Sequence, residues 1–236
     1  MAQICNPNLL INGDFKVWQR GTSFANISTG YICDRWHVYT EGGTCNYENY
    51  NNMLKITLND NKPTYVIYSF EDIDYLKIID VPLCITLKAH NNIYSKSFKI
   101  QEGDNWLELG GVDSISIVSS FNNSNIQLYI DKNIEIEYIK LELGDKATPF
   151  VPRLYAEELA LCKRYYEVIN IWGSTFVTFT GNGDTRGRLP FKEKRTIPTI
   201  SPNSIDIVGI GFGAVSDYAN KTMNLILQAE FYNNIN

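Results

Sequence analysis

The sequence predicts an all-β protein, built as an antiparallel jelly-roll sandwich with one linking α-helix and a small C-terminal antiparallel β domain. Tyr and Phe are abundant, and together with the many Ile residues they favour strands. Short runs of alternating apolar and polar residues recur between turn-forming Asn, Asp and Gly, at a spacing typical of sandwiches. A single stretch shows helical periodicity instead. We therefore expect a jelly roll at residues 1–151, a helix at 152–168 and a β head at 169–236.

The jelly-roll segment contains three runs whose alternation predicts half-buried strands, at residues 54–58, 114–119 and 134–143. The third run has the clearest period of two, and its phase shifts near Tyr138 as at a β-bulge. Residues 70–76 form a connector, and their acidic side chains suit either a turn or a short helix.

The linking helix is predicted from residues 153–168, which contain no Gly, Pro or Asn. Pro152 precedes this stretch and can occupy the first helical position, where its missing N–H costs nothing. Acidic residues near the start and basic residues near the end complement the helix dipole. The apolar stripe, with spacings of four, three and four residues, consists of Tyr155, Leu159, Cys162 and Tyr166.

The C-terminal segment returns to strand patterns. Residues 175–180 alternate, residues 181–184 form a turn, and further strands are predicted at 188–191, 204–208 and 223–231. A unit of fewer than about 70 residues has a marginal core when isolated. We therefore expect it to pack against something else, and self-association is the simplest arrangement.

Composition excludes several partners. The net charge is −5, and no cluster of Lys and Arg is present, which argues against nucleic acid and against an anionic membrane. The sequence shows neither a secretory signal peptide nor an apolar stretch of membrane-spanning length, so we expect synthesis in a cytosol and no membrane insertion. The five cysteines are odd in number and widely spaced, which predicts reduced thiols.

No catalytic constellation stands out, and we expect no enzyme activity and no cofactor. His37 and His90 are the only histidines, and His37 is expected on the solvent face of a strand. No His/Cys pattern suits zinc. The acidic pairs of residues 72 and 74 and of residues 157 and 158 are the nearest approach to glycosidase carboxylates, but neighbouring acids on a helix diverge. The glycines of residues 209–213 lack the spacing of a dinucleotide loop.

Three blocks carry a resemblance that extends over nearly the whole chain. They are residues 8–24, which begin Asn-Leu-Leu-Ile-Asn-Gly-Asp-Phe, residues 31–36, and residues 141–166, which contain Ala-Thr-Pro-Phe and Pro-Arg before the predicted helix. In this order they resemble the distal part of bacteriophage tail fibres and related receptor-binding proteins, including those of phage-tail-like bacteriocins. In that family a jelly roll similar to carbohydrate-binding modules precedes a helix and a small β head.

The resemblance implies a homotrimer, located in the virion tail or in a tailocin particle, that binds a bacterial cell-surface glycan or protein and contacts other phage tail proteins. It also implies a helix near the threefold axis, with Tyr155, Leu159, Cys162 and Tyr166 at the trimer interface. The jelly roll begins within ten residues of Met1, so we expect either a compact stand-alone protein or a fragment of a longer fibre. The alternatives are a structural tail or baseplate component and a surface-polysaccharide-degrading enzyme; the latter are usually longer and repetitive.

Sugar binding would use aromatic faces flanked by polar side chains. We expect Trp18 and Trp36 to be packing residues and Arg20 and Asp34 to form a structural ion pair, while the resemblance leaves open a calcium ion held by Asp14 and Glu142. Receptor specificity in this family usually lies in the head, which gives the candidate ligand-binding residues Trp172, Asp184, Arg186, Asp217 and Tyr218.

Overall fold

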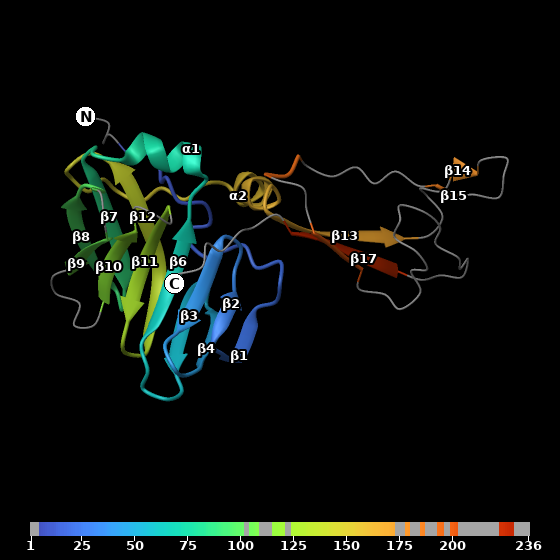
Figure 1. Cartoon of the computed structure of the whole chain (residues 1–236), viewed down its shortest axis with the longest axis horizontal. Helices are drawn as coiled ribbons and strands as arrows, with labels where there is room; N and C mark the ends of the chain where they lie inside the picture. Colours follow the sequence, from blue (N-terminus) through green and yellow to red (C-terminus); the bar gives the residue numbers. More distant parts are fainter. Residues whose placement is uncertain are drawn as a thin grey trace. The chain divides into compact units, whose positions relative to one another are not determined.

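The computed structural model describes residues 5–101, 104–108, 115–120, 124–172, 178–179, 185–186, 193–195, 199–202 and 222–228. The chain divides into two compact units, the first extending to Leu159 and the second beginning at Ala160. The described residues are mostly β-strands in antiparallel sheets, with short helices (Figure 1). This confirms the all-β prediction.

The first unit is a sandwich of two antiparallel sheets, here named sheet A and sheet B. Within the described residues, each sheet has six strands. The order in sheet A is β1 (Ser23–Ile27), β4 (Cys45–Tyr50), β5 (Met53–Leu58), β12 (Ile134–Leu143), β7 (Leu83–Ala89) and β8 (Asn92–Phe98). The order in sheet B is β2 (Thr29–Tyr31), β3 (Trp36–Thr40), β6 (Thr64–Ser69), β11 (Asn125–Ile130), β10 (Ile115–Ser120) and β9 (Asp104–Glu108).

The chain crosses repeatedly between these sheets, as a jelly roll requires, so that β12 lies in the middle of sheet A although it is the last strand of the sandwich. The core between the sheets consists of the inward-facing residues of both, mainly Ile, Leu and Val. Sheet B adds an aromatic cluster, in which the Trp36 ring lies 5.1 Å from Phe15 and 5.2 Å from Tyr68 between ring centroids. Each fully buried side chain of this size contributes about 1.5–3 kcal/mol.

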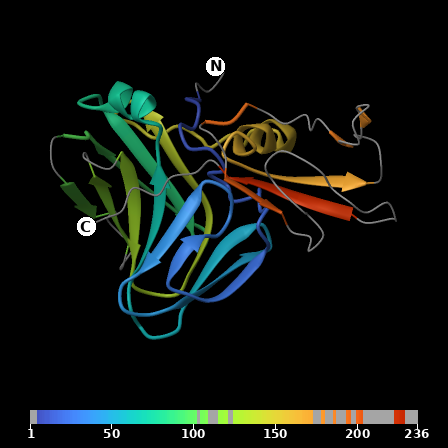
Figure 2. The ribbon, with the colours of Figure 1, turned by 45° about the vertical axis from the view of Figure 1, so that its right-hand side comes forward.

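A short helix occupies the connector that the sequence left open between a turn and a helix. It comprises α1 (Asp72–Tyr75) and the 3₁₀ turn η1 (Leu76–Ile78). Tyr75 and Ile78 belong to the buried core, and α1 lies at one end of the sandwich in both views (Figures 1 and 2). The helix therefore closes that end with two apolar side chains.

The predicted bulge is present in β12. The register of β12 against β7 shifts between Ile136 and Tyr138, at the point where the apolar pattern changes phase. Before the bulge only alternate residues are buried, whereas residues 138–142 are all buried. The charged side chains of Lys140 and Glu142 are consequently carried into the interior.

The linking helix is shorter than predicted, and this boundary was wrong. The helix α2 extends over Tyr155–Cys162, and β13 (Tyr166–Trp172) begins at a residue that the sequence placed in the helix. Pro152 lies before the first helical residue. Tyr166 pairs with Gln228. The β-branched and aromatic residues that follow the helix therefore form their backbone hydrogen bonds in a sheet.

The second unit is described in part. Its strands β13, β17 (Thr222–Gln228) and β16 (Thr199–Pro202) form a three-stranded antiparallel sheet, and β14 (Thr178–Phe179) pairs with β15 (Thr185–Arg186). Near the start of β13, the buried Lys194 ammonium donates to Glu167 Oε2 at 2.6 Å and to the Lys163 carbonyl. The strands predicted at 188–191 and 204–208 lie outside the described residues.

Candidate functional site

Asn12 holds together the first two sequence blocks of the resemblance. Its Nδ2 donates to the carbonyls of Val17 and Asp34, both at 2.9 Å, and its Oδ1 accepts from the Val17 N–H at 2.9 Å. The Trp36 indole N–H donates to the Asn12 carbonyl at 2.8 Å. Asn12 is fully buried, so every one of these bonds forms out of contact with water.

Arg153 joins the third block to the first. Its guanidinium donates to the Leu10 carbonyl at 3.1 Å, to the Asn8 carbonyl and to both carboxylate oxygens of Glu158 at 3.2 Å. Glu158 is buried and accepts a further bond from the Asn12 N–H. We call this group of five residues, Asn8, Asn12, Asp34, Arg153 and Glu158, the junction.

The backbone at and near the junction is unusual as well. Asn12, Phe15 and Arg35 have φ values of 56°, 53° and 73°. Asn tolerates this left-handed conformation, but for a bulky residue such as Phe15 it costs about 1–3 kcal/mol. The buried Phe15 ring and the bonds of Asn12 offset this cost.

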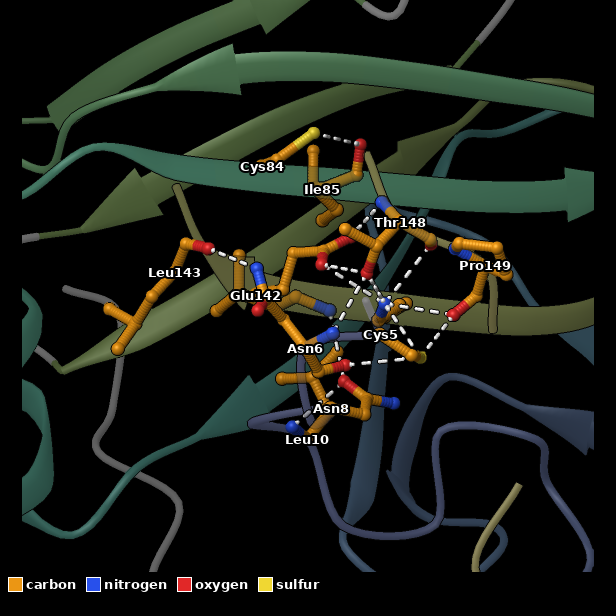
Figure 3. Close-up of polar contacts among 12 residues, drawn as sticks. Cys5, Asn6, Asn8, Leu10, Cys84, Ile85, Glu142, Leu143, Thr148 and Pro149 are labelled. Carbon is orange, nitrogen blue, oxygen red and sulfur yellow. Dashed lines mark hydrogen bonds and ion pairs between the residues drawn. The ribbon is translucent and has the colours of Figure 1, made fainter. Parts of the chain in front are cut away.

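A buried ion pair between Lys140 and Glu142 lies beside the junction, and Glu142 belongs to the third block. Lys140 Nζ is 3.0 Å from Glu142 Oε2, and it donates to Thr148 Oγ1 at 2.6 Å and to the Pro149 carbonyl at 3.1 Å. Cys5 Sγ donates to the same Pro149 carbonyl at 2.7 Å. Figure 3 shows Cys5, Glu142, Thr148 and Pro149 arranged around this centre. The start of the chain is thereby fastened to β12.

A groove of about 370 Å³ opens between these two groups of contacts, lined in part by Cys5, Asn8, Asp14, Phe150, Arg153 and Glu158. Its polar side chains are engaged inside the protein. Asp14 pairs with Lys16 at 2.8 Å, Asn8 Nδ2 donates to the Ile139 carbonyl at 3.0 Å, and Arg153 pairs with Glu158. Phe150 stacks on Tyr138, with ring centroids 4.2 Å apart. The side chains that line the groove therefore stabilise the fold, and we call this region the seam.

The expected structural roles of the other motif residues are present. Trp36 is buried in the core, Trp18 packs against it, and Arg20 Nη1 lies 3.5 Å from Asp34 Oδ1. His37 is different from the expectation, because it is buried rather than solvent-facing. Burial first, and the positive charge of Arg20 second, lower the pKa of His37 from 6.5 to about 4.

Of the acidic residues considered for calcium or catalysis, Glu157 is exposed on α2, and the others have partners within the protein. Glu142 and Asp14 pair with lysines, as described above, so their charges are already compensated. Asp72 accepts a bond from Ser124 at 3.1 Å and Asp74 pairs with Lys77 at 2.9 Å. Over the part of the chain that the structure describes, no three His, Cys, Asp or Glu side chains cluster as metal ligands would.

The predicted ligand-binding residues of the head are only partly placed. Trp172 is the last residue of β13 and pairs with Thr222, and Arg186 lies in β15 opposite Thr178. Asp184, Asp217 and Tyr218 lie outside the described residues.

The four residues predicted for the trimer interface do not form one stripe. Tyr155 is exposed and Leu159 half-buried on α2, whereas Cys162 is buried at its end. Tyr166 is buried in β13. Other exposed apolar side chains of this region are Val151 and Leu154, which precede α2, and Leu161 near its end.

A second surface feature was not expected from the sequence. Tyr39, Tyr65 and Tyr129 occupy directly opposed positions on β3, β6 and β11 of sheet B, and we call them the tyrosine row. Strand alternation indicates that each strand carries a tyrosine outward, but the register that aligns the three joins distant parts of the chain. Sequence patterns carry no signal for that register.

Comparison with known proteins gives no relative: no family model, curated protein or solved structure matches the chain. Among the residues described, no helix is both long and apolar enough to cross a membrane.

Proposed function

We propose that this chain is a receptor-binding protein of a bacteriophage tail, or of a phage-tail-like bacteriocin, that binds the bacterial surface for adsorption. The proposal includes a homotrimer that contacts other tail proteins. The junction is the observation that carries it. The three blocks of the resemblance are far apart in the sequence, yet Asn12, Asp34 and Glu158, one from each block, are connected by buried hydrogen bonds.

This convergence supports the resemblance because each block has little specificity alone. Asn12 fixes the turn of the first block onto Asp34 of the second, and Arg153 fixes the helix start onto the same turn. Thr148 and Pro149 of the third block hydrogen-bond the Lys140–Glu142 pair: both accept from the Lys140 ammonium, and the Thr148 N–H donates to the Glu142 carboxylate. The motif residues therefore form one physical unit.

Two further observations favour binding over catalysis. Of the carboxylates considered for catalysis, Glu158 is buried in an ion pair with Arg153, Asp72 accepts a hydrogen bond from Ser124, Asp74 pairs with Lys77 on the surface, and Glu157 is exposed. The sandwich is a rigid scaffold, and Val151, Leu154 and Tyr155 leave an apolar surface exposed next to α2, which suits contact with a second copy. The tyrosine row provides a separate aromatic surface.

The test is adsorption of the full chain, fluorescently labelled, to a panel of bacterial strains. We expect saturable binding that is restricted to some strains and is competed by the unlabelled chain. Antibodies against the chain should label the tail tips of phage or tail-like particles in electron micrographs.

Each alternative predicts a different result. A purely structural tail component would decorate particles but bind no cells, which would contradict the proposal. A polysaccharide-degrading enzyme would release reducing ends from purified surface polymer. Binding of equal strength to every strain would indicate non-specific adhesion and would also contradict the proposal.

A further inference from the structure

The tyrosine row lies on the outer face of sheet B. The residues on either side of each tyrosine point inward: Val38 and Thr40 flank Tyr39, Val66 and Thr64 flank Tyr65, and Leu128 and Ile130 flank Tyr129, and all six are buried. Because successive side chains of a strand alternate, the three tyrosines project away from the core. Figure 1 shows their strands β3, β6 and β11 side by side.

The three rings lie next to one another and are tilted, by 32° between Tyr39 and Tyr65 and by 67° between Tyr65 and Tyr129. The centroids of Tyr39 and Tyr65 are 6.2 Å apart, and those of Tyr65 and Tyr129 are 5.3 Å apart. Tyr39 is 40% exposed, and the other two rings are half-buried. The row lies on hydrogen-bonded strands within the sheet, so its shape is set before any ligand arrives, which lowers the entropic cost of binding.

We propose that the tyrosine row is a glycan-binding site, at which sugar rings of the bacterial surface lie against the tyrosine rings. This inference rests on the proposed function and specifies the ligand class and the residues. Aromatic rings suit the apolar C–H faces of a sugar, while the phenol hydroxyls can donate to and accept from its hydroxyl groups.

The electrostatic surroundings of the row favour an uncharged saccharide. The pKa of Tyr65 is raised by burial, by the Glu41 carboxylate and by the two other tyrosines. Among the described Asp, Glu, Lys and Arg side chains, Glu41 is the one whose charge raises the pKa of Tyr65. Glu41 is exposed and directly follows β3. A negative charge at this edge repels phosphate-rich or acidic polymers but accepts hydrogen bonds from neutral sugars.

Tyr39→Ala and Tyr50→Ala are the matched variants that test the row. Tyr50 is 43% exposed, a fraction similar to that of Tyr39, but it lies on β4 of sheet A. Binding is measured with polysaccharide extracted from a strain to which the full chain adsorbs. We expect roughly tenfold weaker binding for Tyr39→Ala, equivalent to about 1.4 kcal/mol for the lost ring contact, and no change for Tyr50→Ala. Tyr39→Phe should retain most of the affinity.

Thermal unfolding of all three variants controls for damage to the fold. Equal binding by Tyr39→Ala and Tyr50→Ala would overturn the row as the site while leaving the proposed function intact. Adsorption abolished by protease treatment of the cells but not by periodate would overturn the glycan as ligand and indicate a protein receptor. Absence of adsorption to every strain would contradict the proposed function, and the glycan site with it.

Discussion

Gly13 is a position where a single methyl group should disturb the junction. A Cβ at this residue would lie 2.5 Å from the Ile139 carbonyl oxygen, and the Gly13 carbonyl itself accepts the Ile139 N–H at 2.7 Å. The backbone cannot yield without breaking that bond. We expect Gly13→Ala to lower the free energy of unfolding by about 1–3 kcal/mol, measured by urea titration with tryptophan fluorescence.

Gly42 provides the control for Gly13→Ala. Its φ is +65°, and among the described residues no atom beyond its chain neighbours would lie within 4 Å of a Cβ added there. Because Asn tolerates the left-handed conformation, Gly42→Asn should change the free energy of unfolding by no more than about 0.5 kcal/mol. Equal losses at the two positions would show that close packing at Gly13 is not the cause.

His37 should make the stability depend on pH. Its pKa is about 4 in the folded chain and near 6.5 when unfolded, so unfolding takes up a proton between these values. The contribution is fully present above pH 6.5 and is lost as the pH falls towards 4. Between pH 7 and pH 5 we expect a loss of about 2 kcal/mol, measured by urea unfolding at each pH.

Substitution of the two histidines separates this effect from the titration of carboxylates. His37→Gln should flatten the dependence between pH 7 and pH 5, because the titrating group is gone. His90→Gln, at an exposed position, should retain the dependence. A steep dependence that persists in His37→Gln would assign it to other groups.

The start of α2 is held by charge as well as by hydrogen bonds. Replacing Arg153 with Met would leave the buried Glu158 carboxylate without its cation and two backbone carbonyls without a donor. We expect Arg153→Met to lower the free energy of unfolding by about 2–3 kcal/mol, less than for a fully buried pair because Arg153 is half-buried.

Two comparisons make the result at Arg153 specific. The double variant Arg153→Met with Glu158→Gln should lose less than the sum of the single losses, since the stranded charge is removed. Lys77→Met breaks an exposed ion pair with Asp74 and should cost no more than about 0.5 kcal/mol. Additive losses at Arg153 and Glu158 would indicate that they act independently.

Sequence periodicity predicted the strands and the bulge whose residues are neighbours in the sequence. The alternation of residues 134–143 revealed both β12 and its bulge, because burial in a strand has a period of two. The end of α2 could not be predicted in this way. Residues 163–168 contain no helix breaker, and the helix stops where pairing with β17, distant in the sequence, gives Tyr166 and Val168 a strand partner.

The candidate sites show the same division. The ion pair of Arg20 with Asp34 follows from residues close in the sequence and was predicted. The sequence predicted a solvent-exposed His37, but this residue is buried in the folded chain. The tyrosine row was not predicted, because it depends on the register of three strands. Burial and register are properties of the assembled sandwich, so sequence periodicity alone does not contain them.

At the scale of the whole molecule, the buried ion pairs indicate which residues stabilise the fold, and the exposed apolar and aromatic side chains indicate which could bind a partner. Lys140, at 1% exposure, shares the interior with Glu142, and Glu158 is buried with Arg153. These pairs lie at the seam between the start of the chain, β12 and α2. The tyrosine row lies on the outer face of sheet B, apart from these pairs, so substitutions in the row should alter binding without altering stability. The apolar side chains of Val151, Leu154 and Tyr155 are exposed but flank Arg153 in the sequence.

The proposed homotrimer can be tested on one of these surfaces. Three copies of the 26.9 kDa chain have a mass of about 81 kDa, which light scattering after size-exclusion chromatography should find at micromolar concentration. Leu154 is 72% exposed, and burying it between copies would stabilise the assembly. We expect Leu154→Lys to shift the mass towards that of one chain while leaving the β-sheet signal of the folded sandwich in circular dichroism unchanged.

Ile93 supplies the matched control for Leu154, because it is 62% exposed but lies on β8 at the edge of sheet A. Ile93→Lys should leave the mass at that of the wild-type chain. A monomeric wild type would contradict the trimer itself, whereas an intact trimer of Leu154→Lys would contradict only the surface. Substituting Cys162 or Tyr166 cannot make this distinction, because both are buried within the chain and their loss would disturb its fold before its assembly.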